Sequence, residues 1–310
     1  LLMPRWRPDG SINGIRIQRL KDKLGNRANA SSEVEFIDAH AVLIGEEGRG
    51  VPTIIEMVNG TRLDCVIGSA AQMRQAVAQA AWHVAHRRAF GSKLIDKPLM
   101  QNVIADLEIE VEVATLMMAR LAGSFDRAPD DGDEANFRRV ALPLAKFWVT
   151  KQATGVVREA MECLGGNGYV EESTLPPLFR ESPLNAIWEG SGNVIALDFL
   201  RASQRVRAGL DSFIAELEIA ASHDVAAVRA IEAAKELLSS DAPETEARRI
   251  VEALARAWGA ALVIRHGDDH LIGGYTGSRL GDRAFSQYGA MSAHLPFEAL
   301  ARRAVPAVGS

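Results

Sequence analysis

The residues best suited to chemistry lie in one short run, Trp188-Glu189-Gly190-Ser191-Gly192-Asn193. A carboxylate that removes a proton next to a carbonyl group needs an apolar, shaped pocket, which raises its pKa toward neutrality. Glu189 could be such a base, with the Trp188 ring forming part of the pocket. The alternative is that Glu189 is a helix-start carboxylate, which the helix dipole stabilises.

A glycine cluster, Gly165-Gly166-Asn167-Gly168, precedes this run by about 20 residues. Clustered glycines let a backbone approach a phosphate or a ring closely. Alternatively, they form the C-cap and loop that end a helix. The pattern before the cluster is helical rather than strand-like, so it is not the dinucleotide fingerprint of a strand-loop-helix unit. Ser191 and Asn193 supply a hydroxyl and an amide that could hold a polar ring or a phosphate.

Two arginines are further candidates for ligand contacts. Arg87 could bind a pyrophosphate through its fork of donors, and the nearby Phe90 could stack on a heteroaromatic ring. The alternative for Arg87 is a solvated basic turn. Arg62 could contact a phosphate or a thioester ligand, and its alternative is a surface ion pair with Asp64.

Composition excludes several classes of protein. The chain of 310 residues has 47% hydrophobic and 24% charged residues and a net charge of −5, so nothing favours non-specific binding to nucleic acid or an anionic membrane. No apolar run is long enough to span a membrane, and no signal peptide is visible. Two cysteines, Cys65 and Cys163, suit a reducing compartment, so we expect a cytoplasmic protein.

The sequence offers little to a metal ion. His266 and His270 have a spacing that two ligands on a helix could use, but Gly267 disfavours a helix there, and we predict no metal site. The chain opens with Leu1 inside an apolar, strand-like run. We therefore expect the C-terminal part of a longer protein.

The pattern along the chain predicts a small β piece followed by long helices. Turn signals at Asp9-Gly10 and Asn13-Gly14 and the alternation over residues 32–37 indicate strands in residues 1–50. Residues 51–121 read as helical, with one long helix over 66–86 and a new helix that opens at Pro98.

Further helices are predicted downstream. A helix over 134–164 should stop at Gly165-Gly166, and prolines in 170–186 predict an irregular connector. Residues 192–220 and 244–265 read as helical, with a break at 241–244.

The motifs together resemble the acyl-CoA dehydrogenase family. That family carries, in this order, Arg-x-x-Phe-Gly, Gly-Gly-x-Gly and an aromatic-Glu-Gly-Thr/Ser, which match residues 87–91, 165–168 and 188–191. Residues 19–31 and 187–194 resemble the AidB-like branch, flavoproteins of the bacterial alkylation response. The tail of about 120 residues after Glu189 fits the same branch.

The resemblance implies a mostly α fold. Residues 1–50 would be the C-terminal part of the middle β-domain, 51–203 the C-terminal four-helix bundle with the flavin site and the tetramer core, and 204–310 an AidB-like helical extension. The β-domain strand and loop beside the flavin ring would lie in a missing part, so the flavin site of this chain would be incomplete.

The resemblance also implies roles for single residues. Glu189 would take the α-proton of an acyl-CoA while a hydride leaves the β-carbon for FAD. Contacts to FAD would come from Trp188, Gly190, Ser191 and Asn193, and contacts to the FAD of a neighbouring subunit from Arg87, Phe90, Gly165 and Gly166. Substrate contacts would come from Arg62 and Asn193. Trp188 stands where tyrosine is commoner and could narrow the acyl pocket.

Two functions follow from the resemblance. The first is FAD-dependent α,β-dehydrogenation of an acyl-CoA by a homotetramer, with an electron-transfer flavoprotein as a partner. The alternative is a flavoprotein that associates with double-stranded DNA and has vestigial dehydrogenase activity. Residues 201–310 hold 13 basic and 14 acidic residues, and this net charge of −1 weakens the prediction of DNA binding, which favours basic surfaces.

Overall fold

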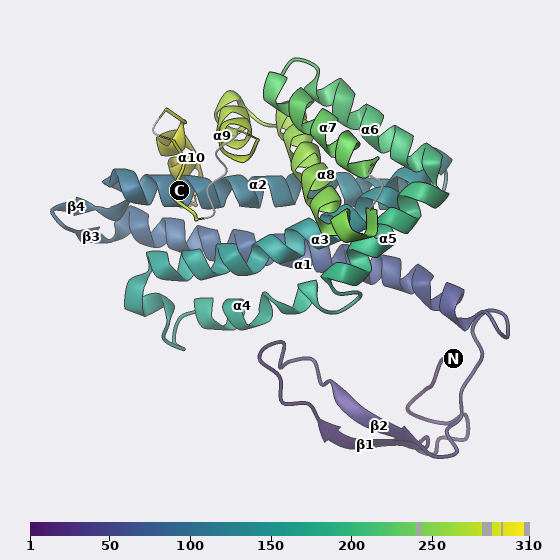
Figure 1. Cartoon of the computed structure of the whole chain (residues 1–310). Helices are drawn as coiled ribbons and strands as arrows, with labels where there is room; N and C mark the ends of the chain where they lie inside the picture. Colours follow the sequence, from purple (N-terminus) through teal and green to yellow (C-terminus); the bar gives the residue numbers. More distant parts are fainter. Residues whose placement is uncertain (240–242, 281–286, 293, 307–310) are drawn as a thin grey trace. The chain divides into compact units, whose positions relative to one another are not determined.

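The structure is a computed structural model that describes residues 1–239, 243–280, 287–292 and 294–306. The chain divides into two compact units, Leu1–Thr61 and Arg62–Ser310, and the boundary lies within the first long helix. The elements (Figure 1) are β1 (Ile15–Leu20), β2 (Ser32–Phe36), α1 (Gly50–His86), β3 (Arg88–Ala89), β4 (Ser92–Lys93), η1 (Leu94–Asp96), α2 (Pro98–Arg127), α3 (Gly132–Cys163), η2 (Gly165–Gly168), α4 (Leu175–Glu181), η3 (Leu184–Ala186), α5 (Gly192–Arg205), α6 (Arg207–Ala221), α7 (Val225–Leu238), α8 (Pro243–His266), α9 (Asp269–Arg279) and α10 (Phe297–Arg303).

The first unit contains an antiparallel pair of strands. β1 pairs with β2, from Ile15 opposite Phe36 to Leu20 opposite Ser32, with a bulge between Ile17 and Arg19. The strand predicted over residues 32–37 is confirmed within one residue. Ile17, Leu20 and Phe36 are about 60% exposed, because a two-stranded ribbon alone has no second layer to cover its apolar side chains.

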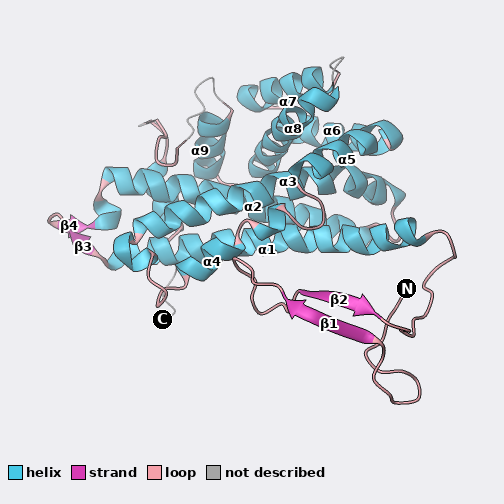
Figure 2. Ribbon diagram, turned by 60° about the horizontal axis from the view of Figure 1, so that its bottom comes forward, coloured by secondary structure: helices cyan, strands magenta, loops and turns pink. Residues whose placement is uncertain are grey.

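Long helices dominate the second unit, as predicted. Figures 1 and 2 show α1, α2 and α3 running side by side. α2 opens at Pro98, where proline suits a first turn because the N–H it lacks would have no helical partner. Asp131 is the N-cap residue of α3, and its carboxylate accepts from the N–H groups of Asp133 and Glu134. The prediction of a mostly α fold is confirmed.

The centres of α2 and α3 are buried on every side. All residues of 104–111 and of 140–150 are buried, whereas a helix at the surface keeps one polar face. The burial arises because α8 and α10 pack against α2, while α5, α6 and α8 pack against α3. The tail therefore completes the core around these two helices.

Charged residues inside this core are paired where the tail meets α2. Arg279 of α9 donates from Nε to Glu110 at 2.8 Å and forms an ion pair with Asp106. The other carboxylate oxygen of Asp106 accepts from the backbone N–H of Gly289 at 2.9 Å. Removal of the cation from such a pair would leave a buried carboxylate without a partner and would destabilise the fold.

The prediction for the segment between the glycine cluster and the run that begins at Trp188 is wrong. Residues 170–186, expected to be an irregular connector, contain the helix α4 and the short turn η3. Pro176 and Pro177 lie in the first turn of α4, where proline has no hydrogen bond to lose. The helical stretch predicted over 192–220 is two helices, α5 and α6, separated at Val206.

The remaining predictions concern the tail, membrane-spanning helices and the domain boundaries. The predicted helix over 244–265 is confirmed as α8, while the break at 241–244 lies mainly outside the described residues. Within the described ranges, no helix has both the length and the apolar character that a membrane crossing requires. The division into domains at residues 50 and 203 stays a prediction.

Candidate functional site

Glu189 lies in a strained turn between η3 and α5. Its φ of 56° places it in the left-handed region, and Gly190 follows with a φ of 108°. A glutamate rarely adopts this conformation, which costs free energy and persists only when surrounding contacts impose it. Ser191 then serves as the N-cap residue of α5. The alternative that Glu189 is a carboxylate in the first turn of a helix is therefore incorrect, because Glu189 lies two residues before the N-cap of α5.

Two buried cations bind three successive carbonyl groups of this turn. Lys146 of α3 donates from Nζ to the carbonyls of Trp188 at 2.9 Å and Gly190 at 2.5 Å. Arg62 of α1 donates from Nε to the carbonyl between them, that of Glu189, at 2.9 Å. We call residues 188–190 the base loop. Its conformation is thus fixed by side chains from two helices that are distant in sequence.

Arg62 also belongs to a partly buried ion-pair network. Its Nη1 lies 2.8 Å from Asp198 of α5, and Nη2 of Arg139 lies 2.6 Å from the other oxygen of that carboxylate. Burial by itself would raise the pKa of Asp198, but the bonds and charges of Arg139 and Arg62 outweigh it and hold the pKa below its ordinary value. The predicted surface pair of Arg62 with Asp64 is wrong, because Arg62 is 7% exposed and its guanidinium is bound to these other partners.

The Lys146 ammonium is almost fully buried. Burial, with a smaller contribution from the positive charge of Arg62, lowers its pKa to about 8, while Cys65 and Glu189 act to raise it. The Cys65 thiol, also buried, has its pKa raised, mainly by burial. Lys146 therefore holds its proton in a desolvated place beside the base loop.

The Glu189 carboxylate itself has no bonding partner among the described residues. Within the described part of the chain it forms no hydrogen bond and no ion pair, although its charge is felt by both Lys146 and Cys65. The residue is half-buried. A carboxylate that is partly withdrawn from water and lacks a partner is available to accept a proton from a ligand.

Trp188 flanks this carboxylate and is anchored at its polar edge. The indole N–H donates to Oδ1 of Asn185 at 2.9 Å, and the amide of Asn185 donates to Ser69 of α1 at 3.1 Å. The ring is 38% exposed. Its orientation is thus set by two buried polar groups, which leaves part of the indole surface for contact with a ligand.

The polar residues after the base loop meet the tail. Ser191 and Asn193 are exposed, and Oδ1 of Asn193 accepts from Nε of Arg248 in α8 at 2.7 Å. A Cβ atom at Gly192 would lie 2.9 Å from the Lys151 side chain, so only glycine fits there without displacing it. The tail therefore contributes a cation to the start of α5.

The second group of predicted residues lies elsewhere on the bundle. Phe90 and Gly91 form the two-residue turn between β3 and β4, with φ of 51° and 85°. The Phe90 ring is 90% exposed, Arg87 is also exposed, and Lys97 donates to the Phe90 carbonyl at 2.7 Å. A large aromatic residue in a left-handed turn that faces solvent is unusual and suggests a binding function.

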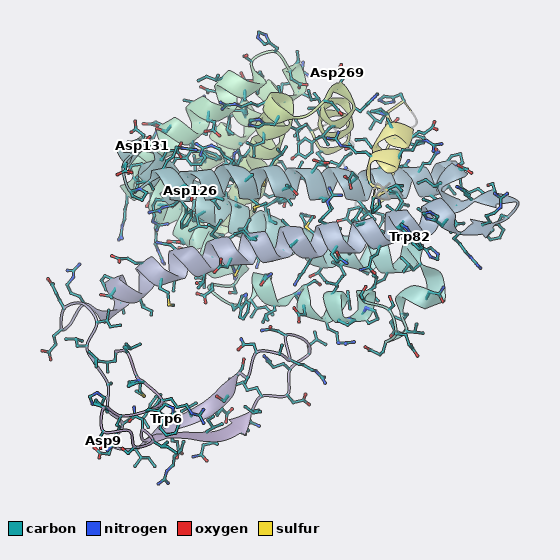
Figure 3. All side chains as sticks on the ribbon, turned by 180° about the vertical axis from the view of Figure 1, so that it is seen from behind. Trp6, Asp9, Trp82, Asp126, Asp131 and Asp269 are labelled. Atoms are coloured by element: carbon teal, nitrogen blue, oxygen red, sulfur yellow. The ribbon has the colours of Figure 1, made fainter. Side chains whose placement is uncertain are left out.

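The glycine cluster lies at the same end of the bundle. Gly165 has a φ of 60° directly after the C-cap of α3, so the helix-cap alternative describes its backbone correctly. A Cβ atom at Gly165 or Gly166 would meet nothing within 4 Å. Leu164 lines a shallow pocket with Trp82 and His83 of α1. Figure 3 shows Trp82 at one end of the long helices and Asp131, the cap of α3, toward the other.

The predicted residues therefore form two groups. Arg62, Trp188, Glu189 and Gly190 come together near the start of α5, followed by Ser191 and Asn193. Arg87 and Phe90 lie at the β3–β4 turn (Figure 1), and Leu164, which directly precedes Gly165 and Gly166, lies beside Trp82 and His83 at the same end of α1. Arg62 and His86 are 24 residues apart on one helix, which corresponds to about 36 Å at 1.5 Å per residue.

Sequence reasoning missed Lys146, Asp198 and Arg248. A signal existed for Lys146, because it is the only charged residue within the otherwise apolar run 140–149, and a buried lysine needs a specific partner. Asp198 and Arg248 occupy ordinary helical positions with no such signal. The possible metal site near His266 gained no support, since Asp268 caps α9 and pairs with Arg303. No group of three metal-ligating side chains exists among the described residues.

Comparisons with known proteins identify the family of this chain. Residues 48–204 match the C-terminal domain of acyl-CoA dehydrogenases. The chain is similar to AidB of Escherichia coli (strain K12), with 49% identity over 214 residues, which are 69% of this chain and 39% of AidB. It is also similar to acyl-CoA dehydrogenase family member 11 of Caenorhabditis elegans, with 32% identity over 286 residues, 85% of this chain and 46% of that protein.

Solved structures of acyl-CoA dehydrogenases are also similar to this chain. The crystal structure of Caenorhabditis elegans ACDH-11 in complex with C11-CoA superposes with a TM-score of 0.79 at 27% identity, covering 97% of this chain and 51% of that one. The chain thus spans about half the length of these relatives. The AidB-like resemblance is confirmed by the identity to AidB. This chain belongs to the acyl-CoA dehydrogenase family.

Proposed function

We propose that this chain supplies the catalytic base and part of the FAD site of a flavin-dependent acyl-CoA dehydrogenase. One observation carries the proposal. Buried cations bind the carbonyls of residues 188–190, while the Glu189 carboxylate within that loop has no hydrogen-bonding partner among the described residues. The contacts hold the backbone of the loop and leave its acid unpaired.

The chemistry that this arrangement supports is removal of a proton next to a thioester carbonyl. The Glu189 carboxylate takes the proton from the α-carbon of the acyl chain, and the electrons of that C–H bond become part of the new α,β double bond. FAD, when bound, accepts the hydride that leaves the β-carbon.

The residues present fit such a cofactor. Gly165 and Gly166 expose a backbone with open space where side chains would be, so a phosphate or ribose can approach closely. Phe90 presents a solvent-exposed ring, and the exposed Arg87 provides a fork of donors. These features support contacts to the adenosine half of FAD.

The separation of the two residue groups supports a site shared between subunits. Since Arg62 and the β3–β4 end lie about 36 Å apart along α1, we propose that Glu189 and Gly190 serve one FAD, while Arg87 and Phe90 contact the FAD of a neighbouring copy. A homotetramer is the expected assembly. Light scattering of the full-length protein, with flavin absorbance in the same peak, tests both the mass and the cofactor.

The substrate class follows from the relatives. ACDH-11 was solved in complex with C11-CoA, which supports an acyl-CoA as the substrate of this chain. The prediction that Arg62 contacts the substrate stays a prediction, and its present partners, the Glu189 carbonyl and Asp198, indicate that it acts through the base loop. Arg248 occupies only the amide oxygen of Asn193, and no described residue accepts from its N–H groups, so these are open to a ligand.

Replacement of the base tests the proposed function. Full-length Glu189→Gln should retain its flavin spectrum and lose acyl-CoA turnover by at least about a thousandfold, the upper part of the range for a general base. Glu172→Gln, which changes an exposed glutamate outside the base loop, is the matched control and should keep wild-type turnover. Turnover by Glu189→Gln at the control's rate would remove Glu189 from the mechanism.

Association with double-stranded DNA, implied by the AidB-like branch, stays a second prediction. The nearly neutral tail offers no general attraction to phosphate. Gel retardation of a duplex at several salt concentrations tests it: binding through phosphates should weaken steeply with salt, and no retardation at low salt would exclude it. An electron-transfer flavoprotein as the acceptor and a cytoplasmic location likewise stay predictions.

A further inference from the structure

Lys146 is an unusual residue for the place it occupies. It lies in the middle of α3, inside the apolar run 140–149, and is 1% exposed. A buried ammonium is costly unless its donors are satisfied. Most buried lysines meet this need with a carboxylate, but no ion pair of Lys146 exists among the described residues. Its donors go to the carbonyls of Trp188 and Gly190 instead.

These two carbonyls stand on either side of the Glu189 residue. Both must point toward Nζ, at 2.9 and 2.5 Å, while Arg62 draws the Glu189 carbonyl to itself at 2.9 Å. Lysine and arginine side chains commonly bind the last carbonyls where a helical turn ends, and here the chain leaves the turn η3 through the left-handed φ values of Glu189 and Gly190. The contacts of Lys146 and Arg62 hold the three carbonyls in this strained turn.

We propose that Lys146 is a positioning residue for the base: by binding the carbonyls on both sides of Glu189 it holds the base loop in the conformation that presents the carboxylate to the substrate. The inference rests on the proposed function of Glu189. Arg62 secures the same loop but is shared with Asp198, whereas both hydrogen bonds that Lys146 Nζ forms with described residues are to the loop. Lys146 therefore has the more specific effect.

The groups around Lys146 make its protonation relevant. Cys65 and Arg62 face it from α1, Glu189 from the base loop, Asp198 lies behind Arg62 on α5, and Lys151 follows one turn later on α3. Burial lowers the pKa of Lys146 to about 8, so the ammonium becomes a neutral amine, with weaker donors, within an accessible pH range. Turnover should then fall above about pH 8 in the wild type.

The test uses the full-length flavoprotein and Lys146→Met, with Lys235→Met as a control that removes a surface lysine of α7. Hydrogen–deuterium exchange of peptides covering residues 184–196 should rise at least tenfold in Lys146→Met, with exchange in α1 and α2 unchanged. The turnover number should fall at least about a hundredfold, with the KM for acyl-CoA within about threefold of wild type. Lys235→Met should match the wild type in every measurement.

A second variant keeps the test decisive if Lys146→Met does not fold. Lys146→Gln retains one amide donor, so it should show the same changes at an intermediate size and lose the fall in turnover above pH 8. The inference would be overturned if a folded variant, Lys146→Met or Lys146→Gln, showed the same exchange of the base loop and the same turnover as the wild type. This outcome is distinct from failure of the proposed function, in which Glu189→Gln itself remains active.

Discussion

Two clusters of buried charge in the helical unit are balanced in opposite ways. At the base loop, Lys146 and Arg62 direct donors to main-chain carbonyls, and the Glu189 carboxylate has no bond to any described residue. Where the tail meets α2, Arg279 is paired with both Asp106 and Glu110. The first cluster uses cations to fix a backbone, and the second uses a cation to neutralise acids.

The difference separates a reactive site from a structural contact. Desolvated charges are normally matched by opposite side-chain charges, because unmatched ones destabilise the fold. Here Arg62 is paired with Asp198 and also binds the Glu189 carbonyl, while Lys146 binds the carbonyls on either side of it, so the Glu189 carboxylate is left for another partner. The pairing of each buried charge is thus informative about function, whereas the number of charges in a cluster is not.

The largest effect on stability is expected at the tail contact. Arg279→Met would leave Asp106 and Glu110 buried without their cation, and it should lower the free energy of unfolding by about 3–5 kcal/mol. Urea unfolding measures this. Arg207→Met, which removes an exposed pair with Asp211, should change it by less than about 0.5 kcal/mol. A loss below about 1 kcal/mol for Arg279→Met would contradict the structural reading of this cluster.

At the base loop the same substitution should act on both stability and turnover. Arg62→Met removes the donor to the Glu189 carbonyl and should cost about 2–3 kcal/mol of stability, since a buried bond to a charged group is lost. Its turnover number should fall well below that of Arg279→Met measured at equal folded fraction. Arg139→Met, which loses the same partner Asp198 but no loop contact, should show the smaller kinetic effect. Equal turnover in Arg62→Met and Arg139→Met would show that the contact of Arg62 with the base loop has no kinetic effect of its own.

The sequence predicted the helices better than the contacts between them. Pro98 and the alternation over residues 32–37 are local signals, and each is confirmed as the start of α2 and as β2. Pro176 and Pro177 misled the prediction, because proline interrupts a helix only beyond its first turn and the sequence does not show where that turn begins.

For the site, sequence reasoning reached the acid but not what holds it. Trp188, Glu189 and Gly190 stand next to one another and form a recognisable motif. Lys146 precedes Glu189 by 43 residues, and its bonds to the base loop depend on how α3 packs against that loop. Partners of this kind are set by tertiary structure, and the motif alone does not specify them.

Glu108 provides an intermediate case with a dependence on pH. Burial raises the pKa of this α2 carboxyl to about 7, although Arg74, itself 41% exposed, donates to it. Because the folded state binds this proton more tightly, its favourable contribution is full below the ordinary value of 4.5 and is lost as pH rises through 7. The free energy of unfolding of the wild type relative to Glu108→Gln should therefore fall by about 1–2 kcal/mol between pH 4.5 and pH 8.

Urea unfolding of both proteins at these two pH values measures the difference. Glu172→Gln, an exposed change of the same type, corrects for general effects of charge. If the difference between wild type and Glu108→Gln grew as pH rose, the Arg74 pair would dominate over burial, and Glu108 would belong with the fully paired acids of the tail contact.

The smallest expected effect on stability is at Glu189. Because its carboxylate has no bond to the described protein and is half-buried, Glu189→Gln should change the free energy of unfolding by less than about 0.5 kcal/mol. Asp106→Asn, in the same urea assay, should cost about 1–3 kcal/mol, since it weakens bonds to Arg279 and Gly289. A loss above about 1.5 kcal/mol for Glu189→Gln would mean that the folded protein already uses this acid, and a proton acceptor for a ligand could not be inferred from its lack of partners.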